Sequence, residues 1–61
     1  MAGSAVSMDQ AVQMVEHRFR ARVVKAETQR DAGHIVYVLR LLDDSGKVWT
    51  VRVDAANGSV Q

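Results

Sequence analysis

The chain has 61 residues, no cysteine and no proline, and its 8 Lys and Arg residues nearly balance 7 Asp and Glu residues, for a net charge of +1. A chain this short forms one domain with a small core, and without cysteine no disulfide can reinforce it. The charge balance argues against nucleic acid or an anionic membrane as the main partner. No apolar run approaches the roughly 20 residues that a membrane-spanning helix needs.

The first residues are set apart from the rest of the chain. Met1 to Ser4 resemble a start codon followed by a cloning remnant. We therefore expect residues 1–6 to be a disordered extension and residues 7–61 to form the single domain. On this interpretation a native signal or anchor segment would lie outside this sequence.

A helix is expected over residues 8–20. Ser7 is a favourable N-cap residue, and Gln10 three positions later completes a capping box. Asp9 lies in the first turn, where the helix dipole favours a negative charge. Apolar residues then recur at helical spacing and form one stripe. They are Met8, Ala11, Val12, Val15 and Phe19, with Met14 on the flank and Gln13, Glu16, His17 and Arg20 pointing away.

Three strands follow the helix. Residues 22–30 are weakly patterned, whereas residues 34–42 and 47–53 are rich in β-branched and large apolar side chains. Asp31-Ala32-Gly33 and Asp44-Ser45-Gly46 have the composition of the intervening turns. The sequence thus predicts an α+β fold, with one amphipathic helix packed on a three-stranded antiparallel β-meander. An Asn57-Gly58 turn would allow residues 59–61 to form a short fourth strand.

The hairpin loops determine which residues share a face of the sheet. A three-residue loop at 44–46 pairs large apolar residues on one face, which must lie under the helix. The pairs are Leu41 with Trp49, Leu39 with Val51, and Tyr37 with Val53. Val24, Ala26 and Thr28 join that face if the first loop has even length, either Ala32-Gly33 or Asp31 to His34. The predicted core is Val12, Val15, Phe19, Val24, Ala26, Tyr37, Leu39, Leu41, Trp49, Val51 and Val53.

The opposite face should be polar, because only one face of the sheet is covered. Instead several aliphatic residues fall there, with charged residues around them. Such a cluster often marks a contact surface, although valine is also favoured in strands wherever it faces. The candidate contact face consists of Val23, Val36, Val38, Arg40, Leu42, Val48, Thr50 and Arg52. A foreign protein and a second copy of the chain both remain open as its partner.

The sequence offers no catalytic, metal-binding or cofactor-binding residues, and we predict that the chain is not an enzyme. His17 and His34 have no further ligand at metal-binding spacing. The serines and acidic residues are better explained as cap and turn formers than as a catalytic triad, a carboxylate pair or a calcium loop. These residues are Ser7, Asp43, Asp44, Ser45, Asp54, Asn57 and Ser59.

A third hypothesis concerns the basic residues near the end of the helix. Arg18, Arg20, Arg22 and Lys25 are half of the basic residues and could bind nucleic acid or an anionic surface. No exposed aromatic platform is expected beside them. A solvated helix end, where cations suit the helix dipole, is the preferred explanation, and we expect no nucleic-acid partner.

The order of these elements and motifs resembles the PepSY domain family. The most specific parts are Tyr37-x-Leu39-x-Leu41, Asp44-x-Gly46-Lys47 and the ending Val51-Arg52-Val53-Asp54-Ala55-x-x-Gly58. The resemblance covers nearly all of residues 7–60. PepSY domains occur in propeptides of thermolysin-type metallopeptidases and as small bacterial proteins that are secreted, periplasmic or membrane-anchored.

The resemblance implies a non-catalytic, extracytoplasmic module that binds a protein partner, such as a metallopeptidase that it restrains. The alternative is a structural module that forms a homodimer and inhibits nothing. The sequence departs from the family pattern at three places. Arg20-Ala21-Arg22 replaces a frequent Pro-Gly link, and Val38 and Thr50 occupy positions that are commonly acidic. The last two departures remove negative charge from the candidate contact face.

Overall fold

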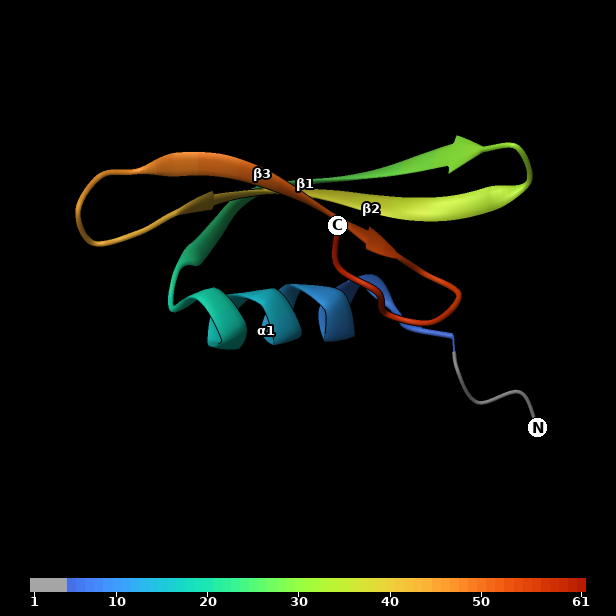
Figure 1. Ribbon diagram of the computed structural model, residues 1–61, viewed down its shortest axis with the longest axis horizontal. Coiled ribbons are helices and arrows are strands. Elements are labelled where there is room, and N and C mark those ends of the chain that lie inside the picture. The colour runs from blue at the N-terminus through green and yellow to red at the C-terminus, as the bar shows by residue number, and fades with distance from the viewer. Residues whose placement is uncertain (1–4) are drawn as a thin grey trace.

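The computed structural model describes residues 5–61 and confirms the predicted α+β class. Helix α1 spans Met8–Phe19 and is followed by strands β1 (Arg22–Asp31), β2 (His34–Leu42) and β3 (Val48–Asp54). The strands form one antiparallel sheet in the order β1-β2-β3. Figure 1 shows α1 lying along one face of this sheet, so the other face is left without a covering layer.

The ends of α1 follow from local hydrogen bonding. The Ser7 hydroxyl accepts a bond from the Gln10 backbone N–H at 3.1 Å, and Gln10 Oε1 accepts one from the Ser7 N–H at 2.9 Å. This is the predicted capping box, which satisfies two otherwise free N–H groups. The helix ends one residue earlier than predicted, because Arg20 turns into the left-handed region (φ 52°) and donates its N–H to the Glu16 carbonyl.

The pairing of β2 with β3 is the predicted one. Leu41 lies opposite Trp49, Leu39 opposite Val51, and Tyr37 opposite Val53. The loop between them is held by two hydrogen bonds, from Gly46 N to Asp43 O and from Asp43 N to Lys47 O, each 3.1 Å long. Gly46 has φ +87°, which only glycine adopts without strain.

The turn between β1 and β2 is the shorter of the two predicted alternatives. Asp31 lies opposite His34, so the loop is Ala32-Gly33, and both of its residues have positive φ, 51° and 82°. A two-residue turn of this kind matches the right-handed twist of the flanking strands. The register places Ala26 opposite Leu39 and Thr28 opposite Tyr37, as predicted.

A β-bulge near the start of β1 changes the faces of its first residues. The register shifts between Val23 and Lys25, so that Val23 lies opposite Leu41 and Val24 has no partner. Val23 packs against the core, whereas the side chain of Val24 is 49% exposed. The predictions of Val24 in the core and Val23 on the candidate contact face were therefore both wrong. One extra residue in a strand reverses the face of every residue before it.

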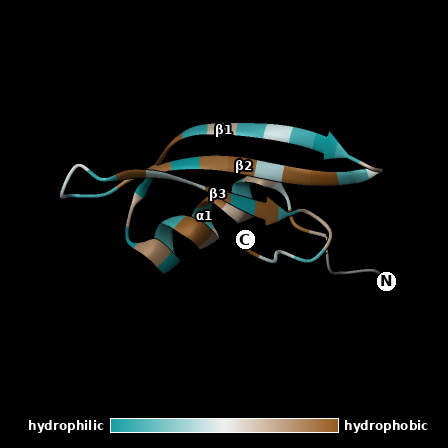
Figure 2. Ribbon diagram, turned by 45° about the horizontal axis from the view of Figure 1, so that its top comes forward, coloured by the Kyte–Doolittle hydropathy of each residue, from teal (hydrophilic) through white to brown (hydrophobic). Residues whose placement is uncertain are grey.

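The core lies between α1 and the two strands β2 and β3. Its fully buried members are Ala11, Val15, Leu39, Leu41, Val51 and Val53. Ala26 was predicted to join them but is exposed. Nine of the ten residues of β1 are exposed, since β1 is an edge strand that extends beyond the helix. A 12-residue helix is only about 18 Å long, whereas a ten-residue strand reaches about 33 Å. Figure 2 shows the contrast between the largely hydrophilic β1 and the largely hydrophobic β2.

The segment before α1 also belongs to the domain. The Val6 N–H donates to the Ala55 carbonyl at 2.8 Å, and the Tyr37 hydroxyl donates to the Val6 carbonyl at 2.8 Å. The predicted domain boundary at Ser7 was therefore placed too late. The rest of the prediction for the N-terminus concerns residues 1–4, which lie outside the described residues.

The C-terminal residues return to β3 without forming a full strand. Val60 makes an isolated bridge with Val53, and Gln61 exchanges two backbone hydrogen bonds with Arg52, at 2.8 and 3.4 Å. The expected short fourth strand is thus reduced to one bridge. It covers the outer edge of only the second half of β3.

Candidate functional site: the open face of the sheet

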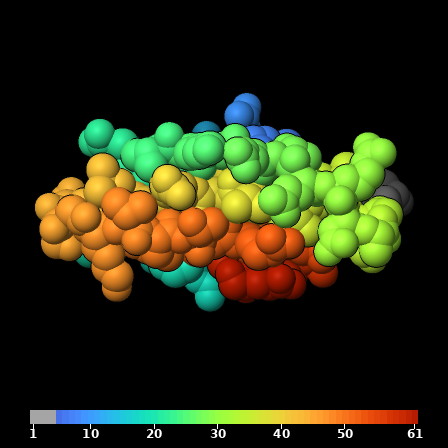
Figure 3. Space-filling model, turned by 90° about the horizontal axis from the view of Figure 1, so that it is seen from above, coloured from blue at the N-terminus to red at the C-terminus, as the bar shows by residue number. Residues whose placement is uncertain are grey.

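The sheet face away from α1, called the open face below, is seen directly in Figure 3, with β2 between β1 and β3. The register aligns its side chains in four rows that run from β1 across β2 to β3. The rows are Arg22–Leu42–Val48, Lys25–Arg40–Thr50, Glu27–Val38–Arg52 and Gln29–Val36–Asp54. The open face therefore draws on all three strands, and its central residues belong to β2.

Seven of the eight residues of the candidate contact face lie on the open face, and Val23 does not. The bulge puts Arg22 where Val23 was expected, opposite Leu42. The aliphatic side chains consequently form two groups, Leu42 with Val48 and Val36 with Val38. Val48 is the most exposed of them, at 54%. The row containing Arg40 separates the two groups.

The cationic side chains of the open face differ in how they are engaged. Lys25 Nζ lies 3.4 Å from Glu27 Oε2, and Arg52 Nη1 donates to Gln29 Oε1 at 3.4 Å. Within residues 5–61 the Lys25–Glu27 pair is the one salt bridge, so Arg40 has no carboxylate partner there. The four rows carry four cations against two carboxylates, a surplus of two positive charges.

A small hollow lies beside Arg40. Its volume is about 70 Å³, and it is lined by Lys25, Glu27, Val38, Arg40 and Thr50. Small-molecule sites typically measure about 300–1,000 Å³. The hollow is therefore too small for a cofactor or a substrate of ordinary size, but it can receive the end of one side chain.

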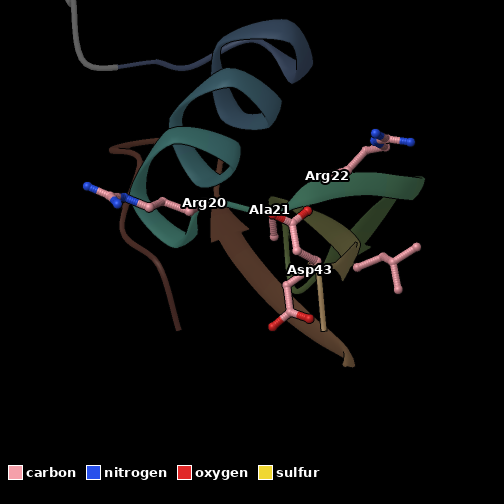
Figure 4. Close-up of a pocket in the computed structure, with 6 residues that line it drawn as sticks. Arg20, Ala21, Arg22 and Asp43 are labelled. Carbon is pink, nitrogen blue, oxygen red and sulfur yellow. The ribbon is translucent and has the colours of Figure 1, made fainter. Parts of the chain in front are cut away.

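A larger hollow of about 310 Å³ lies at the end of α1, beside the loop between β2 and β3. Figure 4 shows that the side chains of Arg20 and Arg22, which line it, point to opposite sides and away from each other. Two arginines in this arrangement do not converge on one anion. The hollow thus offers no phosphate-binding clamp.

Asp43 borders the same hollow but is occupied by its own turn. Its Oδ1 accepts hydrogen bonds from the Ser45 hydroxyl at 2.7 Å, the Ser45 N–H at 2.9 Å and the Lys47 N–H at 2.9 Å. The bond from the Ser45 side chain is the main cause that holds the pKa of Asp43 below its ordinary value, followed by the bond from the Lys47 backbone. Asp43 acts as the turn former that the sequence predicts.

Of the four basic residues near the end of α1, Arg22 and Lys25 lie on the open face, whereas Arg18 and Arg20 do not. The Arg18 guanidinium lies 5.9 Å from the centre of the Phe19 ring, and Lys25 is paired with Glu27 on the open face. Arg20 and Arg22 diverge, as described above. This dispersion gives little support to the nucleic-acid hypothesis, which requires a continuous cationic track.

Glu16 has a role that the sequence did not reveal. Its Oε2 accepts a hydrogen bond of 2.9 Å from the backbone N–H of Val23, the residue after which the register of β1 shifts. We had expected Glu16 to point into solvent. It instead ties α1 to the start of β1 and so helps to place Arg22 on the open face.

Residues 5–61 contain neither a cluster of metal-ligating side chains nor a membrane-spanning helix. Among these residues no three His, Cys, Asp or Glu side chains gather in a way that could hold a metal ion. The single helix described there is also too short and too polar to span a membrane.

Comparison with known families identifies the fold. The family described as "Peptidase propeptide and YPEB domain", PepSY, matches residues 5–61. The chain belongs to the PepSY family. The match agrees with the resemblance drawn from the motifs and extends to Ala5, which is consistent with the hydrogen bonds of Val6. No curated protein and no solved structure matches the chain. PepSY domains are propeptide and regulatory modules, generally non-catalytic and typically extracytoplasmic.

Proposed function

We propose that this PepSY chain is a non-catalytic module that acts outside the cytoplasm and restrains a peptidase by binding it through the open face. The observation that carries the proposal is the presence of four aliphatic side chains, one exposed and three half-buried, on a sheet face with no covering layer. Val38 and Val48 lie where such a sheet ordinarily has polar residues. The association of the family with peptidase propeptides supports the choice of partner.

The size of the open face indicates what kind of contact it can make. Strands about 4.8 Å apart and side chains that recur about every 6.8 Å give its four rows an area of about 400 Å². A stable interface of standard size buries about 800 Å² on each partner. The open face alone therefore supports a transient contact. A tighter one would continue over the free outer edge of β1, where an added strand can pair with the backbone.

A homodimer is the second candidate, and one row of the open face favours it. Glu27, Val38 and Arg52 place opposite charges on either side of a central valine. A second copy turned about a two-fold axis along β2 would set Glu27 of each chain against Arg52 of the other. Such self-complementarity is what a two-fold interface requires.

The two candidates are separated by a capture experiment with Val38→Asp. The wild-type domain and the control variant Thr28→Asp, whose exposed side chain lies on the other face, serve as parallel baits in an envelope fraction of the source cells. We expect both to retain a peptidase and Val38→Asp to lose it while keeping a native circular dichroism spectrum. Equal capture by all three folded baits would refute a role for the open face. Recovery of the domain alone would favour the homodimer.

A further inference from the structure

The open face also indicates the chemistry of the partner. Resting on the function proposed above, we infer that the partner presents an aspartate or glutamate side chain that binds at Arg40. The reasons are the central place of Arg40, the shape of the hollow beside it, and the aliphatic residues around it.

Arg40 is the cation of the open face that is best placed to bind a new anion. It is exposed and lies in the middle strand, between Lys25 and Thr50. Lys25 and Arg52 already contact Glu27 and Gln29, whereas Arg40 has no carboxylate partner within residues 5–61. Its planar guanidinium offers paired N–H donors that match the two oxygens of a carboxylate.

The hollow beside Arg40 is large enough to admit a carboxylate. Its volume is about 70 Å³, whereas about 10–15 Å³ on the same measure already holds one water molecule. An entering carboxylate would meet the Arg40 guanidinium, the Lys25 ammonium and the Thr50 hydroxyl, all of which can donate hydrogen bonds. The Glu27 carboxylate also lines the hollow and is paired with Lys25.

Because aliphatic side chains flank Arg40, we infer that the carboxylate belongs to a protein. Val38 and Leu42 are its neighbours along β2 on the same face, and Val48 lies opposite Leu42. A partner surface that covers them excludes water from the charge pair and strengthens it. A nucleic acid would find no aromatic platform here, because Phe19 and Trp49 pack edge to face beneath the sheet, with ring centres 6.1 Å apart.

The central position of Arg40 disfavours a second copy of the chain as the partner of the open face. The two-fold axis that would pair Glu27 with Arg52 also passes along β2, so it would bring Arg40 of one chain against Arg40 of the other. Like charges that face each other across an interface oppose association. A foreign acidic group meets no such conflict.

The inference can be tested with a displayed library of random 12-residue peptides as the probe. Four folded baits are used: the wild-type domain, Arg40→Glu, Val38→Asp, and the control Arg30→Glu at the exposed end of the β1–β2 hairpin. We expect the wild-type and Arg30→Glu baits to enrich peptides with an acidic residue between aliphatic ones. Arg40→Glu should enrich a basic residue at that position instead. An individual selected peptide should bind Arg40→Gln about thirtyfold more weakly than wild type.

The alternative results are distinguishable. If Val38→Asp abolishes selection but Arg40→Glu enriches the same peptides as wild type, the open face binds its partner and the acidic preference is wrong. If Val38→Asp selects the same peptides as wild type, the proposed function fails together with the inference. An absence of enriched peptides with the wild-type bait, or a stable dimer of the free domain in sedimentation, would likewise overturn the inference.

Discussion

The two adjacent valines of the β1 bulge provide a sharp test of the fold. Val23 lies opposite the fully buried Leu41 and packs on the core, whereas Val24 is 49% exposed and has no partner on β2. A strand without the bulge would place Val24 inside and Val23 outside. With the bulge, a substitution at Val23 should destabilise the domain more than one at Val24. Without the bulge, the order should be reversed.

The size of the effect follows from the buried methyl groups. Val23→Ala removes two of them, at about 0.8 kcal/mol each, so we expect the free energy of unfolding to fall by about 1.5 kcal/mol. Val24→Ala should change it by less than about 0.5 kcal/mol, as exposed substitutions generally do. For a domain of this size the first change lowers the thermal midpoint by about 6–12 °C and the second by less than about 4 °C.

Urea titration followed by the fluorescence of the single tryptophan, Trp49, measures both free energies. Aspartate at each position widens the contrast. Val23→Asp should prevent folding, because the total stability of a 61-residue domain is only about 3–9 kcal/mol. Val24→Asp should fold. If Val24→Ala proved more destabilising than Val23→Ala, the bulge would be wrong, and Arg22 would not belong to the open face.

Two further predictions concern hydrogen bonds that hold the site in place. Glu16→Ala should lower the free energy of unfolding by about 1–3 kcal/mol, because it leaves the Val23 N–H without its acceptor. Glu16→Gln keeps an acceptor oxygen and should lower it much less. Equal losses for the two variants in chemical denaturation would show that the bond does not stabilise the domain. Asp43→Asn should lower stability near neutral pH and have a shrinking effect in acid. The native hydrogen bonds lower the pKa of Asp43, so its stabilising contribution is present above the aspartate pKa of the unfolded chain, about 3.9, and is lost as the pH falls through the lower folded value. A difference in thermal midpoint that stays constant from pH 7 to pH 2 would contradict this.

The parts of the fold that local chemistry determines could be predicted from the sequence. The capping box at Ser7 and the Gly46 turn each involve residues a few positions apart, so their patterns are unambiguous. Once the loop at 44–46 is set, side-chain alternation fixes the pairing of Leu39 with Val51 and its neighbours. Most of the open face, including Val38 and Arg40, followed from the same alternation.

The bulge escaped prediction because strict alternation has no place for an extra residue. One signal was nevertheless present in the sequence. If side chains alternated strictly from Ala26 back to Arg22, the charged Arg22 would face the core. An extra residue at Val24 instead turns Arg22 to the open face. The exposure of Ala26 was missed for another reason, since the lateral position of a helix over a sheet is set by packing between distant segments.

Strand β2 separates folding from recognition along a single stretch of chain. Its odd-numbered residues face the side of α1, where Leu39 and Leu41 are fully buried, while its even-numbered residues, among them Val38 and Arg40, lie on the open face. Because the two sets alternate, a substitution in one need not disturb the other. The same scaffold could thus acquire a different partner through changes at a few even-numbered positions, with the stability of the domain left almost unchanged.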